Sequence, residues 1–105
     1  MATQVEILIL HKQIKQKLAS FLKIQEKQVR QITLDLVNFA KVNEHKITPD
    51  NMYTYFSSKE DALLCKLIDW NQDKKVIKTF FEKLLDMIPM LIDESGNVFN
   101  MTKGS

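Results

Sequence analysis

The scarcity of glycine and proline constrains this chain more than any other feature of its sequence. Only two of each occur among 105 residues, and none precedes Pro49. A β-sandwich or barrel needs many tight turns, and tight turns depend on these two residue types. Leu, Ile, Lys, Gln and Glu are abundant instead, and they lose little conformational freedom in a helix. The sequence therefore predicts an all-α fold, a small bundle of four to five helices.

The length and composition indicate a single domain. A chain of 105 residues has single-domain length, and its 45% hydrophobic and 27% charged residues are typical of a globular protein. We find no internal repeat, low-complexity tract or interdomain linker. From Glu94 on, Ser, Gly, Asn, Thr and Lys dominate the sequence. We expect one helical domain over residues 1–93 and a flexible C-terminal tail over residues 94–105.

Apolar residues recur at helical spacing in two stripes along the first forty residues. The first stripe is Ile7, Leu10, Ile14, Leu18 and Phe21, and the second is Val29, Ile32, Leu36, Phe39 and Ala40. The polar run 25–28 interrupts the phase between them. Either two helices meet at this run, or one long helix bends and changes its buried face. We favour two helices, because a small domain must fold back on itself to cover both stripes.

A helix–turn–helix-like corner is expected near residues 36–58. Thr48 suits an N-cap, Pro49 suits the first helical position, and Asp50 favours the positive end of a helix. They predict a short helix over about 49–56. Ser57 and Glu60 have the spacing of a capping box, so the following helix should begin at once. A last helix should run from about Asp73 to Pro89, which cannot continue it.

The residues that usually carry catalysis or bind metals are sparse in this sequence. The only glycines, Gly96 and Gly104, do not form a phosphate-binding loop. His11 and His45 each lack a second metal ligand three or four residues away. Cys65 lies on an apolar side of a predicted helix, where an inert buried thiol is the better interpretation. We expect a protein without cofactor or metal that binds a partner and is not an enzyme.

The compartment follows from what the sequence lacks. A small secreted domain usually has paired cysteines, whereas this chain has one. No stretch approaches the roughly 20 apolar residues that span a bilayer. The N-terminal region has no basic segment before an apolar run, and Val5–Leu10 is too short for a signal peptide. We expect a cytoplasmic protein, or a nuclear one in a eukaryote, with no membrane partner.

Positive charge is concentrated in the N-terminal third. The formal net charge is only +2, but residues 11–30 contain five lysines and one arginine against one glutamate. Residues 49–105 contain seven lysines against nine acidic residues. A basic helix can face phosphate groups. It can equally be an ordinary solvated helix face, and charge pattern alone does not distinguish these two readings.

A motif within residues 47–64 points to a specific function. It reads Tyr53-x-Tyr55-Phe56-x-Ser58-Lys59-Glu60, with Leu63 and Leu64 after it. This segment resembles the end of the DNA-binding domain in the TetR family of repressors, where a recognition helix ends in Tyr-x-Tyr-Phe before a Ser-Lys-Glu turn. The resemblance covers about 18 residues. His45 and Lys46 stand where the family has a small residue and glycine, and Asp50 replaces a glycine near the phosphates.

The resemblance implies binding to double-stranded DNA, with phosphate contacts from Tyr53, Tyr55 and Lys59. The residue chemistry agrees with it. A short helix capped by Thr48 can enter the major groove with its first residues, Asp50 and Asn51 among them, toward the bases. An asparagine can read adenine with two hydrogen bonds. The predicted DNA-binding residues are Thr48, Asp50, Asn51, Tyr53, Tyr55 and Lys59.

Surplus apolar residues support a second hypothesis, a helical protein-interaction module or small subunit of an assembly with no nucleic-acid contact. Five of the six residues 5–10 are apolar, and residues 80–92 are similarly rich. An apolar surface left over in so short a chain would be an interface, to a second copy or to another protein. Alternatively, the two ends of the chain pack on each other. The candidate interface residues are Ile7, Leu10, Phe80, Leu84, Ile88 and Leu91.

Overall fold

A computed structural model describes residues 4–44, 46–88, 90–92 and 98–100, without the side chains of residues 4–11, 14, 90, 92, 98 and 100. The helices are α1 (Gln4–Leu22), α2 (Glu26–Val42), α3 (Pro49–Ser57), α4 (Leu63–Leu67) and α5 (Lys74–Met87). Two short strands follow, β1 (Met90–Ile92) and β2 (Val98–Asn100). The predicted small helical bundle is confirmed, and two separate helices occupy residues 4–42.

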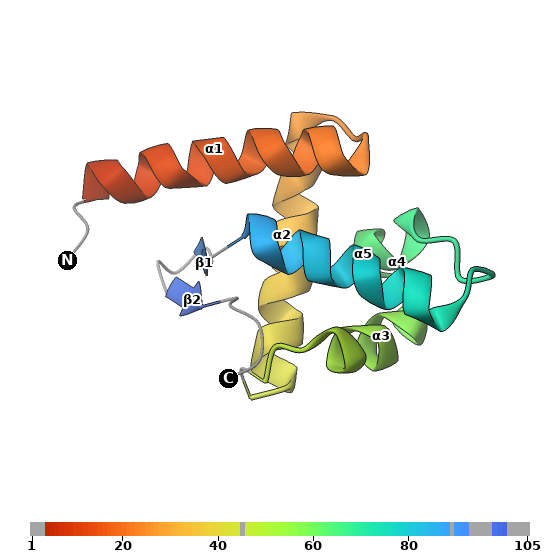
Figure 1. The fold of residues 1–105 in the computed structure, drawn as a ribbon. Helices are drawn as coiled ribbons and strands as arrows, with labels where there is room; N and C mark the ends of the chain where they lie inside the picture. The colour runs from red at the N-terminus through yellow and green to blue at the C-terminus, as the bar shows by residue number, and fades with distance from the viewer. Residues whose placement is uncertain (1–3, 45, 89, 93–97, 101–105) are drawn as a thin grey trace.

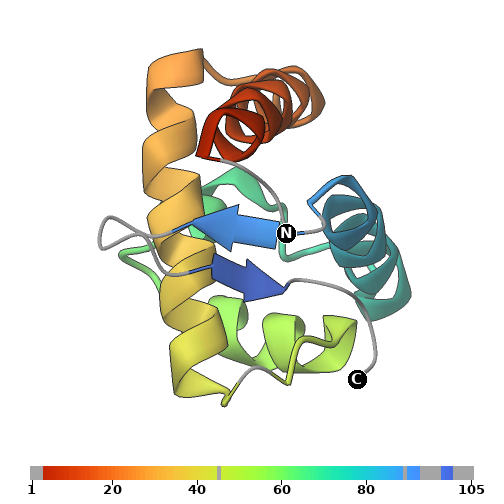
Figure 2. The same cartoon turned by 90° about the vertical axis from the view of Figure 1, so that its left-hand side faces the viewer.

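Helix α2 is the axis around which the other helices are arranged (Figure 1). Helix α1 crosses one end of α2, and α3 lies at the other end, as a view turned by 90° also shows (Figure 2). Helix α5 bridges this span, because it contacts both α1 and α3. Helix α4 packs against α2 and α3. The two ends of α2 therefore carry two separate outer surfaces, one built on α1 and one on α3.

One hydrophobic core joins all five helices. The stripe predicted for α2 is buried, with Ile32, Leu36, Phe39 and Ala40 fully inaccessible to solvent. The Phe56 ring of α3 lies with its centroid 5.7 Å from that of Phe39 in α2 and 6.1 Å from that of Phe81 in α5. These rings fix α3 and α5 against the C-terminal half of α2.

The junction between α1 and α2 shows why a helix ends within the polar run. Lys23 adopts the left-handed conformation, with φ at 57°, and the Ile24 amide donates to the Ala19 carbonyl at 3.0 Å. This six-to-one hydrogen bond closes a helix end. The Gln25 amide then donates to Gln28 Oε1 at 3.0 Å, which satisfies a donor at the start of α2. The reversal therefore uses local hydrogen bonds and no glycine.

The segment after α3 differs from the prediction. The Ser57 hydroxyl donates to the Thr54 carbonyl within α3, and the capping box with Glu60 does not form. Helix α4 begins only at Leu63, where Asp35 Oδ2 in α2 accepts a hydrogen bond from the Leu64 amide at 3.1 Å. Asp35 also accepts from Gln31 Nε2 at 2.9 Å. A carboxylate 29 residues away thus holds the start of α4, and no local pattern reveals it.

Two short strands include part of the segment that was expected to be a flexible tail from residue 94. Strand β2 pairs with β1 in antiparallel register, with Leu91 opposite Phe99. Phe99 is 6% exposed, and Lys41 Nζ of α2 lies 5.7 Å from its ring centroid. The buried ring of Phe99 thus joins β2 to the core. The remaining residues of the expected tail, 94–97 and 101–105, lie outside the described part of the chain.

Candidate nucleic-acid interface

The turn between α2 and α3 sets the angle of the corner. Asn43 closes the end of α2, since both its amide N–H and its side-chain Nδ2 donate to the Phe39 carbonyl at 3.0 Å. Glu44 follows with φ at 54°, in the left-handed region that glycine occupies at no steric cost. The Lys46 amide then donates to the Asn43 carbonyl at 2.9 Å. His45, the residue between them, lies outside the described part of the chain.

The start of α3 is built as the sequence predicts. Thr48 Oγ1 accepts a hydrogen bond from the Asn51 amide at 3.1 Å, and Pro49 is the first helical residue. The Asn51 side chain also stabilises the turn before α3, because its Nδ2 donates to the Lys46 carbonyl at 3.0 Å. Thr48 and Asn51 thus shape the corner. The side-chain amide of Asn51 still has its Oδ1 and a second N–H with which to meet a base.

The two tyrosines lie on different sides of α3, and both are half-buried. The Tyr55 ring meets Phe39 edge-on at 5.4 Å between centroids and Phe56 at 4.8 Å. The Tyr53 ring meets Trp70 edge-on at 5.5 Å, and Lys74 Nζ lies 4.9 Å from its centroid. Packing therefore uses much of each ring, and only Tyr53 stands beside a cation.

Asp50 does not present an unpaired negative charge. Its Oδ1 lies 2.7 Å from Lys78 Nζ on α5. The hydrogen bond from Lys78 and its positive charge hold the pKa of Asp50 below the ordinary value of 3.8, with a smaller contribution from the charge of Lys74. Asp50 and Tyr53 are three residues apart and lie on one side of α3. Lys74 and Lys78 are four residues apart and lie on one side of α5. These two sides meet, because Lys78 contacts Asp50 and Lys74 contacts Tyr53.

The next helix does not begin at once after Ser57, contrary to the prediction, and this places Lys59 outside any helix. Lys59 lies in the link between α3 and α4, four residues before α4 begins, so it does not stand in the first turn of a helix. Its side chain is exposed, and Nζ lies 3.7 Å from Asp61 Oδ1. Such an exposed ion pair is weak. Lys59 can reach a phosphate only as a surface charge, without help from helix amides.

Sequence reasoning missed the lysines that do surround α3. Lys46 precedes the helix and is exposed, while Lys74 and Lys78 reach its side from α5. We call Lys46, Lys74 and Lys78 the corner lysines. Their spacing of four marks Lys74 and Lys78 as one polar edge of an amphipathic helix. The sequence carries no signal for which helix this edge would meet.

The pairing of Asp50 with Lys78 predicts a measurable titration. In Lys78→Gln the pKa of Asp50 should return toward 3.8, because the largest cause of its depression is removed. The ion pair stabilises the folded protein above pH 3.8. This stabilisation is lost as the pH falls through the lowered pKa of Asp50. NMR titration of the carboxyl chemical shifts against pH will measure the Asp50 midpoint in the wild-type protein and in the variant. An Asp50 midpoint that is the same in both would contradict the ion pair.

Three of the proposed interface residues belong to the core. Leu84 and Ile88 are 0% exposed and Leu91 is 1% exposed, because α5 packs against α1 and α3 and β1 packs against α2. Phe80 is half-buried, with its ring stacked on Phe21 at 5.3 Å between centroids. The interface prediction is therefore wrong for Leu84, Ile88 and Leu91. The side chains of Ile7 and Leu10 lie outside the described residues.

The described residues contain no group of three or more His, Cys, Asp or Glu side chains placed to share a metal ion. No helix among them is both long and apolar enough to cross a bilayer. Cys65 is buried, as the sequence predicted for an inert thiol.

Comparisons with protein-family models, with curated proteins and with solved structures found no match. The likeness to the TetR family thus stays a prediction from the motif at residues 53–64.

Proposed function

We propose that this protein is a non-catalytic DNA-binding protein of the helix–turn–helix type that uses α3 as its recognition helix. The observation that carries the proposal is the chemistry around α3. The solvent-facing residues Asp50, Thr54 and Ser57 are all polar, and the corner lysines flank them from two elements. A helix with its side chains is about 10–12 Å across, so α3 fits a major groove roughly 12 Å wide.

The proposed roles follow from position. Lys46, Lys74 and Lys78 neutralise phosphates, which orients the protein without reading sequence. Asn51 and Thr54 face base edges, and Asp50 can accept a hydrogen bond from a cytosine amino group. The pairing of Asp50 with Lys78 reduces the repulsion that a carboxylate would meet near phosphates. Double-stranded DNA is thus the proposed partner, and a small transcriptional regulator is the proposed biological class.

A charge-matched pair of variants tests this proposal. Lys74→Gln/Lys78→Gln should bind random duplex DNA more weakly at 0.1 M salt, by on the order of 50-fold, and flatten the salt dependence by about two in the logarithmic slope. Fluorescence anisotropy from low to moderate salt measures both quantities. The control, Lys66→Gln/Lys83→Gln, removes the same charge from exposed sites on α4 and α5.

The result that would overturn the proposal is equal weakening by both pairs, because general charge would then explain binding. Absence of DNA binding by the wild-type protein at low salt would also overturn it. If light scattering then showed a stable dimer, the protein-interaction module would be the better function. Exposed apolar side chains offer that alternative little support among the described residues, since Val42, Leu67 and Val76 are on three different helices.

A further inference from the structure

The outer face of α1 is cationic and polar. Among its described side chains, the exposed ones are Lys12, Gln13, Gln16, Lys17 and Ser20. The opposite side of α1 is committed to the core, where Leu18 and Ala19 are buried. Lys23 and Lys27 continue the positive charge through the junction into α2, and both are exposed. We call Lys12, Lys17, Lys23 and Lys27 the α1 lysines.

No acidic residue balances this face locally. Residues 7–25 contain four lysines and no aspartate or glutamate, and Glu26 is the first acidic residue after them. No ion pair between described side chains involves any of the α1 lysines. By helix rise, Lys12 and Lys23 lie about 16 Å apart along the axis, a distance that spans several phosphates of a duplex. The face thus has the charge and the length to contact a DNA backbone.

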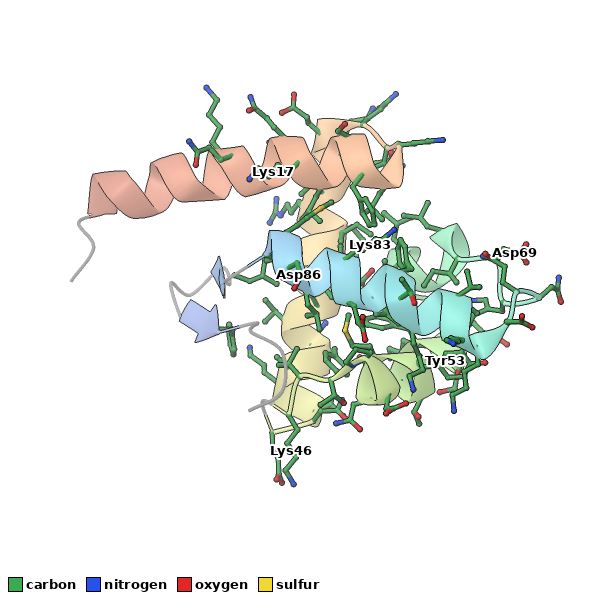
Figure 3. The ribbon with its side chains drawn as sticks, viewed as in Figure 1. Lys17, Lys46, Tyr53, Asp69, Lys83 and Asp86 are labelled. Atoms are coloured by element: carbon green, nitrogen blue, oxygen red, sulfur yellow. The ribbon has the colours of Figure 1, made fainter. Side chains whose placement is uncertain are left out.

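The α1 lysines and the corner lysines lie at opposite ends of α2. Helix α2 has 17 residues, so about 24 Å separates its ends. Figure 3 shows Lys17 on α1, which crosses one end of α2, and Lys46 just past the other end, with α5 between them. In Figures 1 and 2, α1 and α3 lie at opposite ends of α2. A duplex that crosses α3 at right angles to α2 would therefore leave the α1 lysines free to contact a second duplex.

We propose that the outer face of α1 binds the phosphate backbone of a second duplex, so that one chain bridges two DNA segments. This inference rests on the proposed function, which supplies the first duplex at α3. The contact carries no sequence preference, because it offers lysine charges to phosphates only. A membrane surface fits this face less well. A helix that lies in a bilayer interface inserts an apolar side, and the exposed side chains described on α1 are all polar.

A capture assay tests the bridge directly. Beads that carry one immobilised duplex are incubated with the protein and then with a fluorescent second duplex at 0.1 M salt. The wild-type protein should retain the fluorescent duplex. Lys12→Gln/Lys17→Gln should bind single duplexes through α3 but retain the second duplex on the order of 50-fold less well. The control Lys66→Gln/Lys83→Gln should retain it as the wild type does.

The variants separate failure of the bridge from failure of the proposed function. If Lys12→Gln/Lys17→Gln bridges as well as wild type, the α1 inference is overturned, and a dimer of α3 corners would explain the capture. If the wild-type protein binds one duplex and never a second, the bridge is overturned while α3 recognition stands. If Lys74→Gln/Lys78→Gln leaves single-duplex binding intact and the α1 variant abolishes it, α3 recognition fails. Wild-type binding to anionic vesicles with no bridging would assign the α1 face to a membrane surface instead.

Discussion

Replacing Phe56 with alanine is expected to lower the free energy of unfolding by about 3–5 kcal/mol. Phe56 is fully buried in α3, and its ring contacts those of Phe39 in α2 and Phe81 in α5. Its removal takes apolar area out of the core and leaves a cavity where three helices meet. A domain of this size is stable by roughly 5–15 kcal/mol, so much of the stability would be lost. Urea denaturation followed by circular dichroism measures the change.

A shape-conserving control separates the cavity from the loss of aromatic contacts. Phe56→Leu should cost only about 1–2 kcal/mol, because leucine refills most of the space. Thermal denaturation should show the same order, with Tm reduced by roughly 12 °C or more in the alanine variant. If alanine and leucine were equally well tolerated, Phe56 would not be central to the core. The packing of α3 between α2 and α5 would then need revision.

Asp35→Ala is expected to lower the free energy of unfolding by about 2–3 kcal/mol, the second-largest effect. Asp35 is a charged residue on the buried side of α2. Asp35 is 6% exposed, and its carboxylate accepts hydrogen bonds from the Leu64 amide and from Gln31 Nε2. Alanine would leave a buried amide donor at the start of α4 without an acceptor. An unsatisfied buried donor loses its hydration and gains nothing in return. Denaturant titration should therefore show a clear loss of stability.

Two further measurements locate this effect at α4. Asp35→Asn keeps an acceptor oxygen but removes the charge, so it should cost less, about 1 kcal/mol. Glu60→Ala removes an exposed carboxylate nearby in the chain and should change stability by no more than about 0.5 kcal/mol. Amide hydrogen exchange should show that Asp35→Ala lowers the protection of Leu64 most. Unchanged protection at Leu64 would show that the hydrogen bond does not hold α4.

These stability effects matter for the DNA experiments, because the corner functions only while its core is intact. Phe56 and Asp35 are buried, and they position α3 and α4 from inside the core. Variants at these two positions should lose DNA binding only in proportion to the fraction unfolded. The lysine variants should lose DNA binding while their unfolding transitions stay close to wild type. Measuring both properties on each protein keeps the fold and the function distinct.

Local patterns in the sequence were enough to locate the main helices. Thr48 and Pro49 start α3 as predicted, because an N-cap hydrogen bond and a fixed φ angle act within a few residues. The apolar stripe of α2 is buried as predicted, because helical periodicity follows from the backbone itself. The polar run at 25–28 interrupts this periodicity, and α1 and α2 are separate helices on either side of the break. The all-helical class required only the scarcity of glycine and proline.

Tertiary structure alone decided which side chains of these helices remain free. Leu84 and Ile88 were predicted to form an interface, yet both are buried in the core. Helical periodicity identifies the apolar face of a helix but not the element that packs against it. No sequence pattern indicated a charge partner for Asp50, yet Lys78, 28 positions later, lies beside it. Asp35 likewise caps α4 across 29 positions. Contacts between distant residues depend on how helices pack against one another, and short-range pattern does not encode that arrangement.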